Sequence, residues 1–372
     1  MAIEIVAFTP EWEPAVRRFN QRMREGHAPS AFLLPERAGT PRSGLVRAVQ
    51  YIARDGEEVR GGIIVREHPA YLDGRTTDGG GARRETVVNL QSPLSEGIVD
   101  SRHAMVAIQL IRFAVKRCPY AYVVGMGGMD RPLPRLLVAS GWTVRPVPFF
   151  FRILRASRAL RQLQPLQRDW KLRLAATAAA YTGSGALALA VLQRTRATTD
   201  ALRVEAVTEV TDAGRLADDA TWRAIEPRLS FGVVRDGETL PDYLWAQTSR
   251  HRAYRGRQCV GWFSLMISAM RGHSYFGDLK VATLVDVAAA DARDTASLAL
   301  CALEQARAAG CDLVVSNQLH REGQAALRRA GFLTFRSNYL LATSKALSAV
   351  MQDETSLVSR QDGDGLVNLR ER

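Results

Sequence analysis

The chain contains Ala139-Ser140-Gly141-Trp142 after an apolar strand pattern and a short helix pattern. It contains Arg329-Ala330-Gly331-Phe332 in the same setting 190 residues later. At the same offset, Val123-Val124 corresponds to Leu313-Val314. The matching amphipathic helices are expected at 104–116 and 294–306. The sequence therefore predicts that one α/β unit occurs twice in the chain.

Each expected unit has the order strand, helix, three strands, helix, strand, helix, strand. The units are predicted at 1–154 and 201–348, each with a closing strand, at 147–154 and 332–342. A helical, apolar connector at 155–200 is expected between them. The polar tail 349–372 is predicted to be mobile or to lie on the surface as a latch. The predicted fold class is therefore α/β, with two mixed-sheet domains in tandem.

Composition excludes several functions. The net charge is +12, but only four of the 50 basic residues are lysine, and no basic stripe alternates with aromatic residues, which disfavours nucleic acid as a partner. The four cysteines and six histidines show no metal-binding or disulfide spacing, so no metal is expected and a reducing compartment fits. The N-terminus lacks a signal-peptide pattern, and the predicted location is the cytoplasm.

The connector carries an uncharged stretch at 175–193, flanked by basic residues on both sides. Its length is close to the roughly 20 residues that cross a bilayer, but alanine and threonine dominate it, and Gly183-Ser184-Gly185 is expected to break it into two short helices. Three interpretations remain open: a helical hairpin packed on the protein, an interfacial membrane contact through 172–193, or a true span.

The repeated order, and its helix followed by glycine and an aromatic residue, resemble the GNAT acyltransferase fold in tandem. The resemblance implies that acyl-CoA enters a gap between the fourth and fifth strands, with its pyrophosphate on the N-terminus of the next helix. It implies direct transfer to an amine or hydroxyl of a small-molecule or glycan-related acceptor. The stretch from Arg235-Asp236 to Trp245 looks like an element of bacterial GNAT-type proteins in polysaccharide pathways.

The resemblance places the acyl-CoA in the first copy. The family's glycine-rich loop corresponds to 99–104 here and to 290–295 in the second copy, where Asp291 and Asp294 would repel a phosphate. The predicted cofactor contacts of the first loop are Val99, Ser101, Arg102, His103 and Ala104. Beyond this loop, Gly127 and Asn317 follow the fifth strands of the two copies and are predicted to contact the cofactor as well.

The transfer needs a base for the nucleophile and a proton donor for the leaving thiolate. Glu96, beyond the fourth strand, is the predicted base, the adjacent Ser95 is predicted to be catalytic as well, and Asp286 is the counterpart of Glu96 in the second copy. The tyrosine that donates a proton in many GNAT enzymes is replaced by Leu137 and Leu327. Tyr122 or Tyr339 could substitute.

Two other functions stay open at this point. A FemAB-like transferase that uses aminoacyl-tRNA also pairs two such modules. The missing glycines and tyrosines equally fit a catalytically inactive tandem protein that acts as a binding module at a membrane.

Overall fold

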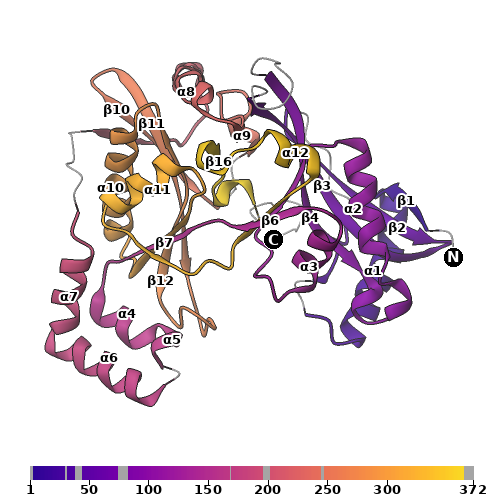
Figure 1. Ribbon diagram of the computed structural model, residues 1–372, viewed down its shortest axis with the longest axis horizontal. Helices are drawn as coiled ribbons and strands as arrows, with labels where there is room; N and C mark the ends of the chain where they lie inside the picture. Colours follow the sequence, from indigo (N-terminus) through magenta and orange to yellow (C-terminus); the bar gives the residue numbers. More distant parts are fainter. Residues whose placement is uncertain are drawn as a thin grey trace.

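The computed structural model describes residues 3–29, 32–37, 44–73, 83–167, 169–195, 202–243 and 247–363. Two mixed β-sheets lie side by side with helices packed on them (Figure 1), which confirms the predicted α/β class with two sheet-centred units. Two features named above fall outside the described residues: Trp245 and the end of the polar tail from 364 onwards.

The first sheet is built mainly by the N-terminal half. Its strands follow the order β1 (Glu4–Ala7), β2 (Arg47–Asp55), β3 (Glu58–Leu72), β4 (Arg83–Ser95), β5 (Ala121–Val124), β15 (Leu340–Thr343) and β6 (Thr143–Pro146), and β9 (Phe231–Val233) pairs with β3. Its helices are η1 (Pro10–Trp12), α1 (Glu13–Glu25), η4 (Glu96–Ile98), η5 (Ser101–His103), α2 (Val106–Arg117) and α3 (Pro132–Ala139). Helix α2, which was expected from its apolar spacing, buries Leu110, Ile111 and Ala114 against this sheet.

The second sheet repeats the arrangement. Its strands follow the order β14 (Leu333–Phe335), β7 (Phe149–Ile153), β13 (Leu313–Asn317), β12 (Lys280–Ala289), β11 (Gln258–Ala269), β10 (Ser249–Arg255) and β8 (Arg203–Ala206). Its helices are α8 (Asp212–Ile225), η6 (Glu226–Arg228), α9 (Leu240–Tyr243), α10 (Ala292–Ala308) and α11 (Arg321–Arg329). In both copies a left-handed glycine ends the last helix, Gly141 with φ 82° and Gly331 with φ 78°, which explains the repeated sequence signal.

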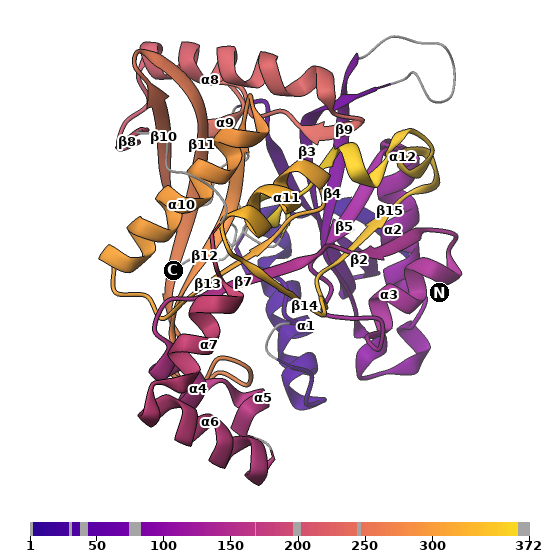
Figure 2. The same cartoon turned by 60° about the vertical axis from the view of Figure 1, so that its left-hand side comes forward.

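The two sheets exchange their closing strands. Strand β7, expected to close the first copy, instead pairs with β13 and β14 of the second sheet. Strand β15, expected to close the second copy, lies between β5 and β6 of the first sheet. Figure 2 shows β7 among the strands of the second sheet. The sheets therefore do not follow the contiguous ranges 1–154 and 201–348, and each copy completes its sheet with a strand from the other.

The tail is not a mobile surface segment in its described part. After α12 (Lys345–Val350), residues Met351–Gly363 run between the two sheets, and we call this segment the C-terminal strap. It contains η7 (Asp353–Thr355), β16 (Ser356–Leu357), which pairs with β9, and η8 (Arg360–Asp362). Its polar side chains Ser356, Ser359, Gln361 and Asp362 are at most 1% exposed. Their hydrogen bonds to residues of both copies offset the cost of removing these polar groups from water.

The connector forms a compact group of short helices. They are α4 (Ala156–Gln162), α5 (Gln164–Gln167), α6 (Trp170–Thr182) and α7 (Ser184–Leu192). Gly183 has φ 76° and separates α6 from α7, which confirms the predicted break. Among the helices that the structure describes, none alone is long and apolar enough to cross a bilayer. Only α6 and α7 taken together meet that criterion, and they are bent by 92°.

Candidate functional site

The first copy has a gap between its two parallel strands. The pairing of β4 with β5 ends at Asn89 and Tyr122, although β4 continues to Ser95. Ser92 has φ 46°, and the register between β4 and β3 shifts at this point, as in a β-bulge. Because the bulge bends β4, the ends of the two strands separate. The resemblance to the GNAT fold implies that acyl-CoA binds in this gap.

A glycine loop follows β5 at the open end of the gap. Gly125, Gly127 and Gly128 have φ values of 90°, 89° and 122°, conformations that side-chain-bearing residues rarely adopt. Gly127, a predicted cofactor contact, is exposed. At Gly127 the absence of a side chain leaves the backbone accessible to a ligand.

The segment 99–104 precedes α2 at the other side of the gap. Ser101, Arg102 and Ala104 are exposed, whereas His103 is buried. Val99 lies against Gly26 and belongs to the core under α1. The N-cap of α2 is Met105, whose side chain accepts no hydrogen bond from the first turn. The amides of that turn are therefore free of side-chain capping, which suits an anionic group.

Arg102 already has an anionic partner. Its guanidinium binds the Asp100 carboxylate at 2.6 and 3.0 Å, and Asp100 also accepts a hydrogen bond from the Arg102 amide. These contacts lower the pKa of Asp100 to about 2. A phosphate that reaches Arg102 must therefore compete with Asp100.

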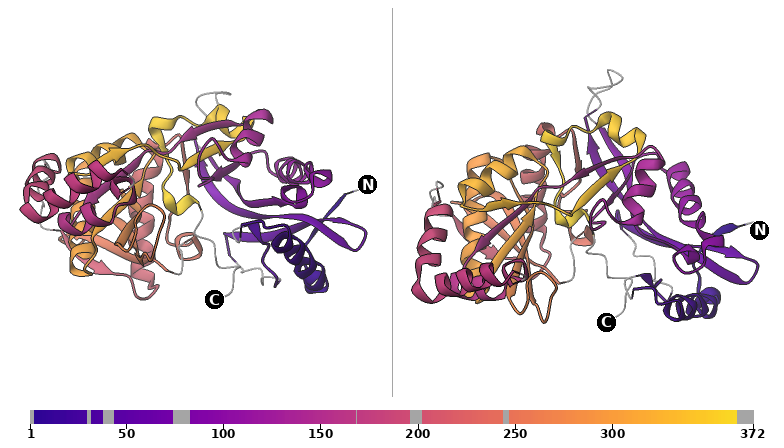
Figure 3. Two further views of the ribbon diagram at one scale, coloured as in Figure 1. Left: turned by 90° about the horizontal axis from the view of Figure 1, so that it is seen from below. Right: turned by 60° about the horizontal axis from the view of Figure 1, so that its bottom comes forward.

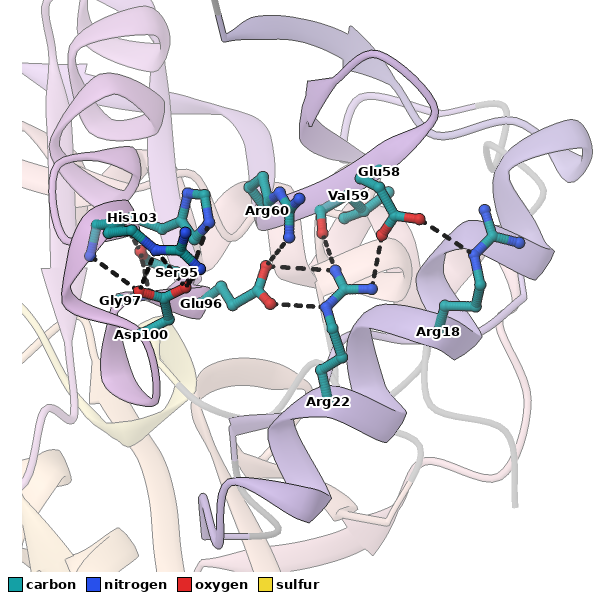
Figure 4. A network of polar contacts seen from close by, with 11 residues as sticks. Arg18, Arg22, Glu58, Val59, Arg60, Ser95, Glu96, Gly97, Asp100 and His103 are labelled. Carbon is teal, nitrogen blue, oxygen red and sulfur yellow. Dashed lines mark hydrogen bonds and ion pairs between the residues drawn. The ribbon is translucent and has the colours of Figure 1, made fainter. Parts of the chain in front are cut away.

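The predicted base, Glu96, lies between two guanidinium groups (Figure 4). Its carboxylate accepts hydrogen bonds from Arg22 Nε at 2.6 Å and from Arg60 Nη1 at 2.9 Å. Burial opposes its ionisation, but the two arginines outweigh burial and lower the pKa of Glu96. The adjacent Ser95 hydroxyl donates to the His103 carbonyl at 2.5 Å and accepts from the Gly97 amide. These contacts make Glu96 a weak base and give both side chains a role in holding η4 and η5 in place.

We expect the stability of the first copy to depend on pH through Glu96. Because the folded-state pKa is lowered, its stabilisation is complete above the ordinary carboxyl pKa of 4.5 and is lost as pH falls through the folded-state value. Glu96→Gln should lower the free energy of unfolding by about 1–3 kcal/mol at pH 7. In urea unfolding at pH 7 and pH 3.5, the difference between the two proteins should shrink at low pH. A constant difference would contradict this role.

In the second copy, the equivalent gap is filled. The pairing of β12 with β13 ends at Leu284 and Ser316, and the strap enters beyond it. Ser359 forms a bridge with Gln318, and the Leu319 amide donates to the Val358 carbonyl. At the N-terminus of α10, the Asp291 carboxylate caps the Arg293 amide at 2.6 Å. The second copy therefore satisfies with its own atoms the groups that a cofactor would use.

Asp286 is part of a buried ion network and does not face a ligand gap. Its carboxylate accepts hydrogen bonds from Arg235 Nε and Trp262 Nε1, both at 3.0 Å, and from the Ser359 hydroxyl at 2.9 Å. Arg235 is fully buried and donates through Nη2 to Asp362 of the strap at 2.9 Å. Asp286 thus holds the strap through Arg235 and Ser359.

The network continues into the first copy. Asp362 accepts from the Tyr243 hydroxyl at 2.5 Å, and its carbonyl accepts from Asn89 Nδ2 at 2.9 Å. Asn89 is the last β4 residue that pairs with β5. The sequence indicated Arg235 only as part of an element that resembles a family motif, and it did not indicate Asp362. No local sequence pattern connects two residues that lie 127 positions apart.

Asn317 has a structural environment. Its amide donates to the Val147 and Pro148 carbonyls at 3.1 and 3.3 Å, and its oxygen accepts from Arg360 Nε at 2.8 Å. It is fully buried. The structure therefore places Asn317 where β7 crosses between the sheets and against the strap.

The two alternative tyrosines lie in different surroundings. Tyr122 is fully buried, its hydroxyl is 2.9 Å from His68 Nε2, and burial raises the pKa of its phenol. Tyr339 precedes β15, so the strand exchange carries it to the first sheet. Its hydroxyl and the Val124 side chain both lie directly against Gly363 of the strap. The Gly363 carbonyl accepts from Gln91 Nε2 of β4 at 3.3 Å. Tyr339 therefore lies where β4 and β5 separate.

Among the residues that the structure describes, no three His, Cys, Asp or Glu side chains are grouped as a metal site would require. A hollow of about 240 Å³ is lined by Arg84, Asp219, Arg223, Asp236 and Glu238, away from the β4–β5 gap.

Comparison with solved structures identifies the fold. Saccharomyces cerevisiae N-myristoyltransferase with bound myristoyl-CoA and inhibitors aligns with 92% of this chain and 79% of its own, at 10% identity and a TM-score of 0.50. Weaker likenesses are a probable N-acyltransferase from Enterococcus faecalis (10% identity, 95% and 75% covered, TM-score 0.49) and a tandem GNAT protein from the clavulanic acid biosynthesis pathway (12%, 92% and 98%, 0.46). No family model and no curated protein matches the sequence. Together with the repeated strand order, the first likeness confirms the tandem GNAT fold.

Proposed function

We propose that this protein transfers an acyl group from acyl-CoA, held in the first copy, directly to an amine or hydroxyl acceptor. The observation that carries the proposal is the difference between the copies. The strap runs through the gap of the second copy, whereas only its end, Asp362 and Gly363, reaches the start of the β4–β5 gap in the first. The rest of the first gap is bordered by a glycine loop and an uncapped helix. The aligned N-myristoyltransferase, with its bound myristoyl-CoA, supports the choice of cofactor.

We assign the following roles in binding and acyl transfer to residues of this chain. The first-turn amides of α2 and the exposed Arg102 would hold the pyrophosphate by hydrogen bonds and charge. The backbone around Gly127 would let the pantetheine approach closely. The acceptor's nitrogen or oxygen would attack the thioester carbonyl, and the carbonyl–sulfur bond would break. Tyr339 would protonate the leaving thiolate, and the proton that the acceptor loses would return to the Tyr339 phenolate, so that bonds and protons balance. The acceptor, a small molecule or a glycan-related compound, would enter beside the strap.

Calorimetric titration of acetyl-CoA and longer acyl-CoAs tests the cofactor site. Arg102→Ala should weaken binding about 3- to 10-fold through loss of a charge-assisted contact. Asp100→Asn should strengthen binding by a similar factor, because asparagine keeps the η5 cap while releasing Arg102. Arg321→Ala is the matched control, since Arg321 is equally exposed at 76%, is also ion-paired, and lies in the second copy.

The outcome separates the candidate functions. If no acyl-CoA binds, the proposal fails, and RNase-sensitive activity would then point to an aminoacyl-tRNA donor. If acyl-CoA binds but no acceptor is acylated from a panel of amines and hydroxyls, the protein is a binding module.

A further inference from the structure

We propose that α6 and α7 dock this protein on an anionic membrane surface. The inference does not depend on the acyltransferase function, because the helices lie apart from the first-copy gap. Figure 3 shows the connector helices at the edge of the molecule beside the second sheet, at the opposite end from the N-terminus. Figures 1 and 2 also show these helices protruding from the rest of the molecule. The group of α4, α5, α6 and α7 is called the foot below.

The foot has its small residues inside and its large apolar residues outside. Helices α6 and α7 approach α4 through Ala176, which is buried, and through Gly185, where any side chain would collide with Leu160. Seven of the sixteen large apolar side chains that the described chain exposes lie within 170–192. They are Trp170, Leu172, Leu174, Tyr181, Leu187, Val191 and Leu192. This is the reverse of the usual arrangement on a water-exposed helix.

Helix α7 has no polar face. From Gly185 to Leu192 it contains only glycine, alanine, leucine and valine, and Leu187, Val191 and Leu192 are 65–70% exposed. An apolar helix of this kind is normally covered by protein or lipid. Trp170 and Tyr181 are exposed near the ends of α6, and these residue types concentrate at the level of lipid headgroups.

The positive charge of the foot favours lipids with anionic headgroups. The foot with its flanking residues, 155–196, contains eight basic residues and one acidic residue, a sequence charge of +7, and two of the arginines, Arg155 and Arg158, are paired with the buried Asp312 at 3.7 and 3.5 Å. Lys171 and Arg173 are exposed in the first turn of α6, beside the apolar side chains. Each basic residue near an anionic bilayer strengthens the binding. A second copy of the same foot would instead bring like charges together, which disfavours a dimer through this face.

Vesicle co-sedimentation of the full chain tests the docking. Vesicles of phosphatidylglycerol and phosphatidylcholine in equal parts should retain the protein, pure phosphatidylcholine should retain much less, and added salt should weaken the binding. The double variant Leu187→Glu/Val191→Glu should lose at least about 10-fold in binding because it removes the inserted apolar area. Lys171→Glu/Arg173→Glu should lose a similar factor on the anionic vesicles only.

Leu216→Glu is the matched control, because Leu216 is 65% exposed on α8, outside the foot. It should bind vesicles like the unmodified protein, and unchanged thermal unfolding of every variant would verify folding. Absence of vesicle binding, or full binding by Leu187→Glu/Val191→Glu, would overturn the proposal. So would a dimer in light scattering that this variant abolishes without any vesicle binding, since the foot would then be an interface between copies.

Discussion

Asp362→Ala is expected to lower the free energy of unfolding by about 3–5 kcal/mol. The substitution leaves Arg235, which is fully buried, without one of its two carboxylate partners, and it leaves the Tyr243 hydroxyl without its acceptor. Asp286 still neutralises Arg235, but several buried donors lose their acceptor, and each buried donor left without an acceptor costs about 1–3 kcal/mol. Chemical unfolding at pH 7, followed by tryptophan fluorescence, measures the loss.

The control is Glu354→Ala, which removes another acidic residue of the strap. Its partner Arg321 and Glu354 itself are 76% and 72% exposed, so the variant should unfold like the unmodified protein. If Asp362→Ala has no larger effect than this control, the strap is not held by the ion network.

Local patterns predicted much of the fold. The helices α2 and α10 follow from apolar spacing, and the left-handed Gly141, Gly331 and Gly183 mark the helix ends that the sequence indicated. The strand exchange could not be predicted in this way. The apolar run Phe149–Ile153 is suited to any half-buried strand, and nothing in it distinguishes a position beside β6 from one beside β13.

The strap shows the opposite difficulty. Its serines, glutamine and aspartate read as an exposed tail, because polar residues are usually solvated. Each of these side chains can be buried only because it forms a hydrogen bond with a residue far along the chain. Asp362 accepts from Arg235, and Gln361 donates to the Tyr243 carbonyl. The same limit applied to Glu96, which has the residue type of a base but whose two arginine partners come from α1 and β3.

Tyr339→Phe is expected to lower kcat by about 100-fold or more while leaving the Kd for acyl-CoA unchanged. The hydroxyl lies beside Val124 and Gly363, where β4 and β5 separate, and phenylalanine preserves the packing of a ring that is 8% exposed. Loss of the proton donor affects the departure of the thiolate but not the binding of the pyrophosphate. Steady-state kinetics with saturating acyl-CoA, together with calorimetry, separates these two effects.

Tyr122→Phe is the comparison that decides between the two tyrosines. The Tyr122 hydroxyl contacts His68, whose pKa is held low by burial and by the nearby Arg66 charge, so the pair is neutral and enclosed. Removing this hydroxyl should cost about 1 kcal/mol of stability and leave kcat nearly unchanged. If Tyr122→Phe lost turnover and Tyr339→Phe did not, the proton donor would belong to the first half of the chain. If instead only Tyr339→Phe loses turnover, the exchange of β15 has a catalytic consequence, because it brings a residue of the second half to the site of the first.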